Sequence, residues 1–268
     1  QTKGGTSGQY TRRSALGLLR MRGREANQGR TGEYIGPMFR PLIEGISQRL
    51  PSQCAICHTW PAQPVCDACV AAFAQPVPRC ITCALPVPAG VQRCGDCLLH
   101  PPPVDQCLAA VAYAYPWSGL VVDFKFHQHT GWARTLALLM RSAPWVEPAL
   151  DQADLLIPMP LSSQRLRERG FNQTLELARA LEPAKVAQGL LLRLHDTPPQ
   201  SALPRTERMR SVQGVYAVEP LQASALKSQR VVLLDDVMTT GASLFAAAQV
   251  LREAGAAHIT GLVFARTE

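Results

Sequence analysis

The chain has 268 residues, 47% of them hydrophobic, which is enough to bury the core of one large domain or of two smaller ones. It contains no uncharged apolar run of about 18 residues and no apolar segment of the secretory type, so it predicts neither a membrane span nor export. We therefore expect a cytoplasmic protein. Residues 1–37 hold seven Lys or Arg and two Glu residues and carry +5 of the formal net charge of +7. The rest of the chain is nearly neutral, so the overall charge predicts no particular ligand.

The N-terminal segment has the composition of a disordered chain. Residues 1–37 are rich in Gly, Ser, Thr, Gln and Arg and show weak hydrophobic periodicity. Met38 opens a stretch that looks like an ordinary protein beginning. We expect residues 1–50 to form a disordered extension, with the natural start at Met38. The alternative is a basic arm that binds nucleic acid.

The next segment contains eight of the nine cysteines, arranged as four C-x-x-C pairs. Two such pairs supply four thiolates, the tetrahedral ligand set that suits zinc. We therefore expect a small module over residues 51–100 that holds two structural Zn²⁺ ions and leaves no open ligand position for catalysis. The expected metal ligands are Cys54, Cys57, Cys66, Cys69, Cys80, Cys83, Cys94 and Cys97.

Other uses of these cysteines stay open. Disulfides need an oxidising compartment, a thioredoxin-type redox pair normally occurs once beside a βαβ unit, and an iron–sulfur cluster is chemically possible. The sequence also leaves open whether neighbouring pairs or crossed pairs share a metal. Prolines between the pairs exclude long helices, and the segment from His100 to Asp105 reads as a stiff connector. Cys107, which stands alone, is expected in the core.

Beyond about residue 105, apolar runs alternate with helical periodicity. This alternation predicts a parallel α/β sheet flanked by helices, with ligands bound at the carboxyl ends of the strands. Asn172 is the expected N-cap of one helix, and Gly255 ends another. The expected strands are residues 107–115, 153–160, 230–236 and 258–265, and the expected helices are residues 172–182 and 241–256.

The stretch VVLLDDVMTTGAS (residues 231–243) is the most informative one. We expect a buried strand over residues 231–234 to end at Asp235 and Asp236, and a helix to start near Ala242. The N–H groups of the turn between them, with the helix N-terminus, suit a phosphate, and the carboxylates suit sugar hydroxyls or Mg²⁺. A phosphate close to a diol describes a ribose 5-phosphate. The P-loop lysine is absent, and an ordinary acidic turn before a helix is the alternative.

This stretch resembles the 5-phosphoribosyl-1-diphosphate (PRPP) signature of type I phosphoribosyltransferases. The resemblance implies that Asp235 and Asp236 bind the ribose 2- and 3-hydroxyls, while residues 239–243 hold the 5-phosphate. Ser243 stands where a threonine is common and keeps the hydroxyl. The PRPP-binding residues implied in this way are Asp235, Asp236, Val237, Met238, Thr239, Thr240, Gly241, Ala242 and Ser243.

Other segments narrow the resemblance to the competence protein F family (ComF, with GntX as a relative). Residues 165–181 resemble its R-x-R-G-F-N-Q segment, residues 123–137 its lysine-containing loop, and residues 197–216 its mobile segment. The four C-x-x-C pairs also match. The resemblance covers the chain from Cys54 onward and implies an α/β fold of the type I phosphoribosyltransferase kind over residues 105–268, beside a small zinc module of the four-cysteine type.

Cleavage of the C1–diphosphate bond of PRPP needs cations at the diphosphate and exclusion of water. Residues 197–213 are expected to form a lid, with a disordered surface loop as the alternative. The turn at residues 158–161 either presents N–H groups to the diphosphate or simply ends a strand. The cation candidates are Lys125, Arg165, Arg167 and Arg169, with a solvated helix face as the alternative for the arginines. The expected catalytic residues are Lys125, Arg169, Asp235 and Asp236.

The resemblance implies a phosphoribosyltransferase, a glycosyltransferase of the pentosyl-transfer class. It would use Mg²⁺ to move a 5-phosphoribosyl group from PRPP to an unidentified acceptor, in connection with DNA uptake or utilisation. The alternative is a non-catalytic accessory protein that binds PRPP, another ribose 5-phosphate or a nucleotide, or that handles single-stranded DNA. Expected partners are single-stranded DNA or a protein of the competence machinery.

Overall fold

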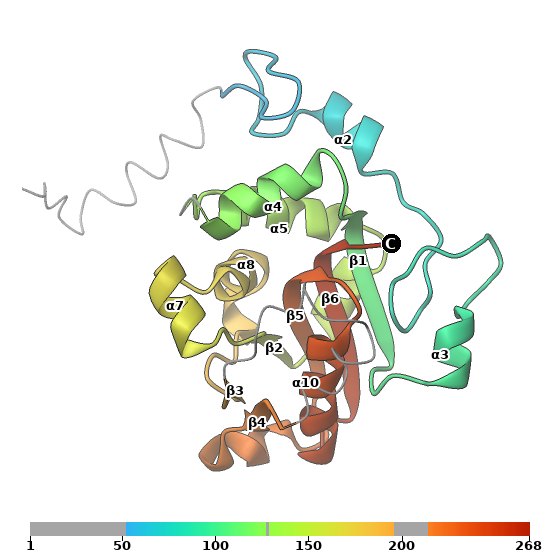
Figure 1. Ribbon diagram of the computed structural model, residues 1–268, viewed down its shortest axis with the longest axis vertical. Helices are drawn as coiled ribbons and strands as arrows, with labels where there is room; N and C mark the ends of the chain where they lie inside the picture. The colour runs from blue at the N-terminus through green and yellow to red at the C-terminus, as the bar shows by residue number, and fades with distance from the viewer. Residues whose placement is uncertain (1–51, 127–128, 196–213) are drawn as a thin grey trace, which may run out of the picture. The chain divides into compact units, whose positions relative to one another are not determined.

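The computed structural model describes residues 52–126, 129–195 and 214–268, all within one compact unit that spans Pro51–Glu268. At its centre lies a parallel four-stranded sheet of order β1-β6-β5-β2 (Figure 1). The expected α/β class and parallel sheet are therefore confirmed. The expected N-terminal extension and the expected lid (197–213) lie outside the described residues. The strands are β1 (Gln106–Ala112), β2 (Leu155–Pro158), β5 (Arg230–Met238) and β6 (His258–Arg266).

Helices cover both faces of the sheet. Side chains alternate along β5, so that Val232 and Leu234 join one apolar cluster while Val231 and Leu233 join another. The first cluster includes residues of α4 (Trp117–Phe126), α5 (Trp132–Ser142), α6 (Val146–Gln152) and α8 (Gln173–Leu181). The second includes residues of α10 (Ala242–Glu253). The core therefore lies on both sides of one sheet, as expected for a parallel α/β fold.

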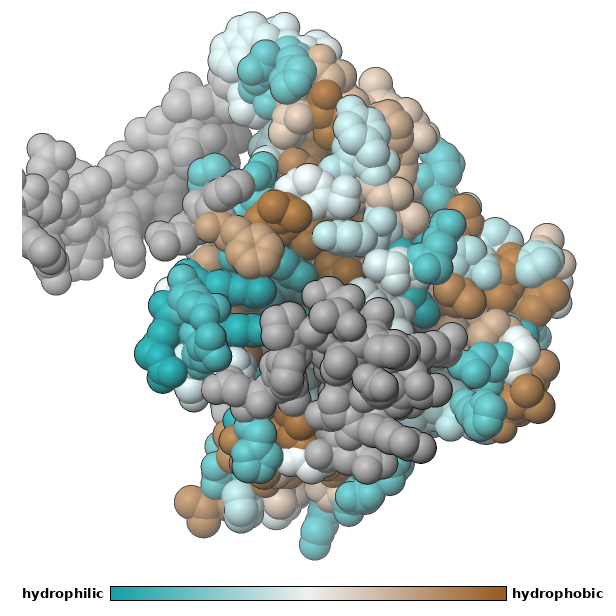
Figure 2. Space-filling view, viewed as in Figure 1, coloured by the Kyte–Doolittle hydropathy of each residue, from teal (hydrophilic) through white to brown (hydrophobic). Residues whose placement is uncertain are grey.

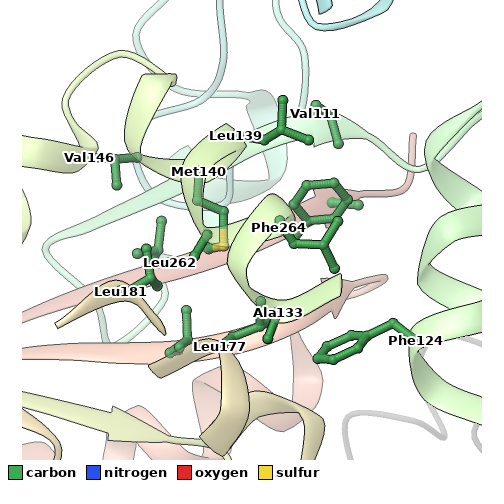
Figure 3. Close-up of a cluster of buried hydrophobic side chains, with 14 of the residues drawn as sticks. Val111, Phe124, Ala133, Leu139, Met140, Val146, Leu177, Leu181, Leu262 and Phe264 are labelled. Carbon is green, nitrogen blue, oxygen red and sulfur yellow. The ribbon is translucent and has the colours of Figure 1, made fainter. Parts of the chain in front are cut away.

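The helices form where apolar residues recur at helical spacing. In α5 the buried residues Ala133, Leu136, Ala137 and Met140 are spaced by three or four, which places them on one stripe. Figure 3 shows side chains of this layer gathered around Phe264 of β6. This packing holds α4, α5 and α8 against one face of the sheet.

The expected helix at residues 172–182 is confirmed as α8. The side chain of Asn172, its N-cap, accepts hydrogen bonds from the backbone N–H groups of Thr174 and Leu175. The preceding helix α7 (Ser163–Arg169) ends at Gly170, which has a φ of 78°. A glycine in the left-handed conformation stops α7 and frees Asn172 to start α8.

A smaller antiparallel sheet pairs β3 (Leu191–Arg193) with β4 (Tyr216–Val218). Two 3-10 helices, η1 (Pro183–Lys185) and η3 (Pro220–Leu226), lie in the connections on either side. The sequence did not predict this sheet, because three-residue strands give no readable alternation.

The cysteine-rich segment carries only short helices, α2 (Asp67–Phe73) and α3 (Gly95–Leu99), as its prolines require. The first part contacts α4, because the Trp117 indole N–H donates to the Phe73 carbonyl over 2.9 Å. The second part contacts β1, because the Cys107 N–H donates to the Ile81 carbonyl over 2.7 Å. Cys107 itself is buried, as expected. None of the helices in the described part of the chain has the length and apolar character needed to cross a membrane.

Candidate functional site

The candidate site is a cavity of about 750 Å³, part of it open to solvent, at the carboxyl ends of β2 and β5. Parallel sheets place ligand sites at this edge, as the sequence led us to expect. Most expected site residues line it: Lys125, Arg165, Arg169, Asp235, Asp236, Val237, Met238, Thr239, Gly241, Ala242 and Ser243. Thr240 is not among the lining residues.

The two aspartates lie within β5 and not after its end. The expectation that the strand stops at residue 234 is wrong, because β6 continues to pair with β5 as far as the Met238–Arg266 match. On the other side β2 ends at Pro158, opposite Leu234. Asp235 and Asp236 therefore extend beyond β2 at an edge that the neighbouring strand leaves open to the cavity.

The two aspartates lie close together, and burial and a nearby lysine act on their charges. Lys125 Nζ lies 2.8 Å from Asp236 Oδ1, and Asp236 is only 4% exposed. Its other oxygen, Oδ2, is buried and has no hydrogen-bond partner within the described ranges. Burial, followed by the charge of Asp236, raises the pKa of Asp235 to about 7, although Lys125 and the Asp236 N–H act in the opposite direction. Asp236 Oδ2 is therefore a hydrogen-bond acceptor to which a ligand hydroxyl could donate.

Lys125 comes from the last turn of α4 and not from a loop. Residues 123–137, which resemble a lysine-containing loop, include the end of α4 and the start of α5. The buried residues Leu120, Val121 and Phe124 explain the helix, since their spacing places them together on its inner face. A helix fixes the lysine more firmly than a loop would.

The turn after β5, residues 239–241, is called here the β5–α10 turn. Gly241 caps α10 with a φ of 84°, and a Cβ there would lie 2.5 Å from Met238 Cε and 2.6 Å from Phe245 Cε2. Glycine adopts this left-handed conformation without strain, whereas any side chain here would require Met238 and Phe245 to shift. Thr240 does not face the cavity lining; its Oγ1 accepts a 3.3 Å hydrogen bond from the Ala242 N–H. The twelve-residue helix α10 thus begins at the cavity, with the partial positive charge of its N-terminus there.

A second helix N-terminus, that of α8, also reaches the cavity. Gln173 and Thr174 line it, and the buried Gln173 Oε1 lacks a hydrogen-bond partner in the described part of the chain. Asn172 also donates from Nδ2 to the Met159 carbonyl over 3.1 Å, which ties α8 to the turn after β2. Sequence reasoning missed Gln173 and Thr174 as site residues, although their place after a predicted N-cap was a usable signal.

The expected turn at residues 158–161 does face the cavity, through Met159, Pro160 and Leu161. Two of the three candidate arginines do so as well. Arg169 lies 5.0 Å above the Phe126 ring, and burial lowers its pKa while the charge of Asp236 opposes the change. Arg167 is exposed and fits the alternative of a solvated helix face. Figure 2 shows hydrophilic residues gathered over α7, none of whose residues is buried.

The small β3–β4 sheet contributes two lining residues that the sequence did not predict, Arg193 and Tyr216. Arg193 Nη1 donates to the Tyr216 hydroxyl over 3.4 Å. Burial raises the pKa of Tyr216, while the charge of Arg193 and a hydrogen bond with the Ser243 side chain oppose the rise. No pattern in the sequence brings these residues to the start of α10, because only the tertiary fold does so.

The eight cysteines of the C-x-x-C pairs form two groups, in each of which all four Sγ atoms lie within 4.8 Å of one another. Neighbouring pairs share a group, so crossed pairing is excluded. The first cysteine cluster is Cys54, Cys57, Cys66 and Cys69, and the second is Cys80, Cys83, Cys94 and Cys97.

The sulfur separations fit a metal ion. They are 3.8 Å for Cys54–Cys69, 3.5 Å for Cys57–Cys66 and 3.7 Å for Cys83–Cys94. A tetrahedron with Zn–S bonds of about 2.3 Å has S···S edges of about 3.8 Å. A disulfide bond would be about 2.05 Å long, so these pairs are not disulfides. Both clusters could therefore hold zinc.

The two clusters repeat the same local structure. His58 and Ala84, each directly after a C-x-x-C pair, have φ values of 61° and 55°. The second pair of each cluster starts at a helix N-cap, Cys66 or Cys94, whose N–H donates over 3.4 Å to Cys54 Sγ or Cys80 Sγ. Burial opposes ionisation of Cys54, but hydrogen bonds outweigh it and lower its pKa to about 6. The thiolate form that binds metals is thereby favoured at Cys54, whereas burial raises the pKa of Cys69 to about 12.

No protein-family model matches the chain. DNA utilization protein YhgH of Salmonella typhimurium is 32% identical to it over 211 residues, covering 76% of this chain and 90% of that protein. Competence protein F of Haemophilus influenzae is 30% identical over 189 residues, covering 68% and 82% respectively. Competence protein ComFC of Bacillus subtilis is 35% identical over 118 residues, covering 44% and 46%. With this identity over most of its length, the chain belongs to the family of DNA utilization protein YhgH and competence protein F.

Proposed function

We propose that the cavity binds PRPP and that the protein transfers its 5-phosphoribosyl group to an acceptor. The observation that carries this proposal is the pair Asp235 and Asp236 beside the N-terminus of α10. A carboxylate pair recognises neutral hydroxyl donors, and a helix N-terminus recognises an anion. A ribose 5-phosphate presents both groups a few ångströms apart.

Each part of the substrate has a matching group in the cavity. Asp236 Oδ2, buried without a partner in the described residues, would accept a hydrogen bond from a ribose hydroxyl. The β5–α10 turn and the first turn of α10 would hold the 5-phosphate. Lys125, Arg165 and Arg169 supply positive charge for the diphosphate, whose departure they would stabilise.

Magnesium suits the acidic pair, because Mg²⁺ prefers carboxylate oxygens and substrate phosphates as ligands. Lys125 already occupies Asp236 Oδ1, which leaves Asp236 Oδ2 and the Asp235 carboxyl group to face such an ion. When bound with the diphosphate, the ion would add positive charge at the leaving group. Zinc in the cysteine clusters would be structural, since protein sulfur fills all four positions.

The names of the relatives concern DNA utilisation and competence. We propose that the reaction of this chain also serves the use of DNA taken up from outside. The same names support a second function, in which the cavity binds the 5-phosphate of a nucleotide without catalysis and the protein handles single-stranded DNA. Arg165, Arg167 and Arg169 on α7 would then contact further phosphates of the strand.

Calorimetry with PRPP and Mg²⁺ tests the ligand. We expect the unaltered protein to bind, and the double variant Asp235→Asn/Asp236→Asn to lose at least tenfold in affinity, since two charge-assisted hydrogen bonds become weaker. Asp151→Asn is the matched control, because Asp151 is exposed on α6 outside the cavity lining. Absence of PRPP binding by the unaltered protein would contradict the proposal.

Release of diphosphate separates the two functions. PRPP is incubated with the protein, Mg²⁺ and a panel of bases, nucleotides and single-stranded DNA, and the diphosphate formed is measured. Acceptor-dependent release that Asp235→Asn/Asp236→Asn abolishes supports the transferase. Tight binding with no release by any acceptor supports the non-catalytic function.

A further inference from the structure

Arg266, the last residue of β6, makes an unusual set of contacts for a buried arginine. It is 5% exposed, and its Nε donates to the Cys83 carbonyl over 2.9 Å. Its Nη1 donates to the carbonyls of Met238, over 3.4 Å, and of Thr239. Within the described residues it forms no ion pair with a carboxylate. One guanidinium group thus joins the second cysteine cluster to the start of the β5–α10 turn.

These contacts fix the direction of backbone N–H groups. In a trans peptide the C=O and the following N–H point in opposite directions. Because Arg266 holds the Thr239 carbonyl and shares the Met238 carbonyl with the Thr267 N–H, which donates to it over 3.0 Å, the N–H groups of Thr239 and Thr240 point away from the arginine. An anion-binding turn depends on the direction of such N–H groups.

A second set of contacts links the second cysteine cluster to the turn, through Cys107 and Met238. Ile81, inside the Cys80–Cys83 pair, accepts a hydrogen bond from the Cys107 N–H, and Cys107 Sγ lies 3.7 Å from Met238 Sδ. Met238 in turn packs against Gly241, where a Cβ would be 2.5 Å from its Cε. The same pair of metal ligands therefore supports the turn through both its carbonyls and its side-chain packing.

The first cysteine cluster shows no such connection to the turn within the described residues. Its contact with the sheet domain runs from Phe73 to Trp117 of α4, and its buried residues Cys54 and Cys69 belong to the apolar cluster of the helical face. The two clusters, alike in local structure, thus differ in what they support.

We propose that Arg266 is a positioning residue that makes the geometry of the β5–α10 turn depend on metal in the second cysteine cluster. A metal ion fixes the tight turn from Cys80 to Ala84, and with it the Cys83 carbonyl that Arg266 needs. Without the metal, the second cluster relaxes, Arg266 loses this acceptor, and the turn loosens. The assignment of the turn to a phosphate rests on the proposed function, but the coupling itself does not.

Hydrogen exchange on the full chain tests the coupling without any ligand. Cys94→Ser removes a ligand from the second cluster, and Cys66→Ser removes the equivalent N-cap ligand from the first. We expect Cys94→Ser to speed exchange of the Ala242 and Phe245 amides, which donate to Thr240 Oγ1 and the Gly241 carbonyl in the turn, by about three- to tenfold, the effect of one lost hydrogen bond. Cys66→Ser should leave it unchanged. Exchange at residues 231–234, in the centre of β5, reports global unfolding and should remain slower than exchange at the turn in both variants, which separates local loosening from unfolding.

Arg266→Lys tests the residue directly. Lysine keeps the charge, but its compact ammonium group cannot donate both to the Cys83 carbonyl and to the carbonyls of the turn, as the guanidinium group does. We expect the same faster exchange at the Ala242 and Phe245 amides, with zinc content unchanged and no further increase when Cys94→Ser is added. Arg79→Lys is the matched control, because Arg79 donates over 3.0 Å to the Ala84 carbonyl, and hydrogen bonds from Arg79 to the turn are absent in the described structure.

Three results would overturn the inference: equal effects of Cys94→Ser and Cys66→Ser, no effect of Arg266→Lys, or effects of Cys94→Ser and Arg266→Lys that simply add. Calorimetry with PRPP forms a second arm, in which Cys94→Ser and Arg266→Lys should each weaken binding by about three- to tenfold and Cys66→Ser should not. If the unaltered protein does not bind PRPP, the proposed function fails, while the exchange measurements still decide the coupling.

Discussion

Asp235 carries a carboxyl group whose ionisation the fold opposes. Burial and the neighbouring Asp236 raise its pKa to about 7, well above the ordinary value for an aspartate. A folded-state pKa above the unfolded value means that the folded protein binds the proton more tightly. The resulting stabilisation is fully present below about pH 4 and is lost as the pH rises through about 7.

Asp235→Asn should therefore stabilise the unliganded protein at pH 8, by at most about 4 kcal/mol, because it removes the cost of a partly buried charge beside Asp236. The gain should be much smaller at pH 5, where the folded unaltered protein keeps the carboxyl group protonated. Thermal unfolding at the two pH values measures it, with Asp151→Asn as the exposed control. A variant that is equally stable or less stable at pH 8 would show that the Asp235 environment does not oppose its charge.

At Gly241, close neighbours and a left-handed backbone limit which residue the position accepts. Gly241→Ala should destabilise the protein by about 1 to 3 kcal/mol and weaken PRPP binding, because a Cβ would collide with Met238 and Phe245 in a left-handed backbone. Gly119→Ala in α4 is the matched control, since nothing lies within 4 Å of its Cβ position. Urea unfolding should show little change or a slight gain for this control. Equal effects of the two substitutions would count against the strained cap.

Single residues differ in how far the sequence could place them. Asp235 and Asp236 follow a readable apolar run, and their position near a strand end is a local property. Gln173 becomes a lining residue only because Asn172 caps α8 beside the turn after β2. Tyr216 reaches the cavity through a three-residue strand whose pairing depends on distant residues, which no local pattern encodes.

At the scale of elements, β5 explains both a success and an error of sequence reading. Its apolar run predicted a buried strand correctly, because such runs are typical of parallel sheets. Its end was wrong because strand length depends on neighbours: β6 pairs up to Met238, whereas β2 stops at Pro158. The uneven length of the neighbours is what leaves the aspartates at an open edge.

For the cysteine repeats, the sequence predicted which residues could bind metal but not which pairs would come together. The capacity of these cysteines to hold metal was readable from spacing alone, since a C-x-x-C pair can place two thiolates at one metal position. Their pairing was not, because sequential and crossed groups satisfy the same spacing. The structure decides for neighbouring pairs, each completed by a helix N-cap cysteine, Cys66 or Cys94.

At the scale of the whole molecule, each cysteine cluster belongs to a different one of the two apolar layers that cover opposite faces of the sheet. Cys54 and Cys69 belong to the layer with α4 and α5, whereas Cys80 and Cys97 belong to the layer with α10. A metal ion in each cluster would thus stabilise a different side of the core. This arrangement makes the cysteine-rich segment part of the folding unit.

We expect two zinc ions per chain, and one in either Cys66→Ser or Cys94→Ser, because each cluster has its own four ligands. Both variants should unfold at lower temperature, since structural zinc supplies folding free energy. The loss should be larger for Cys94→Ser, because the second cluster bonds directly to β1 through Cys107 and to β6 through Arg266. Atomic spectrometry gives the zinc content and calorimetric melting the stability. A larger loss for Cys66→Ser would mean that the contact with Trp117 supports the fold more than both strand contacts together.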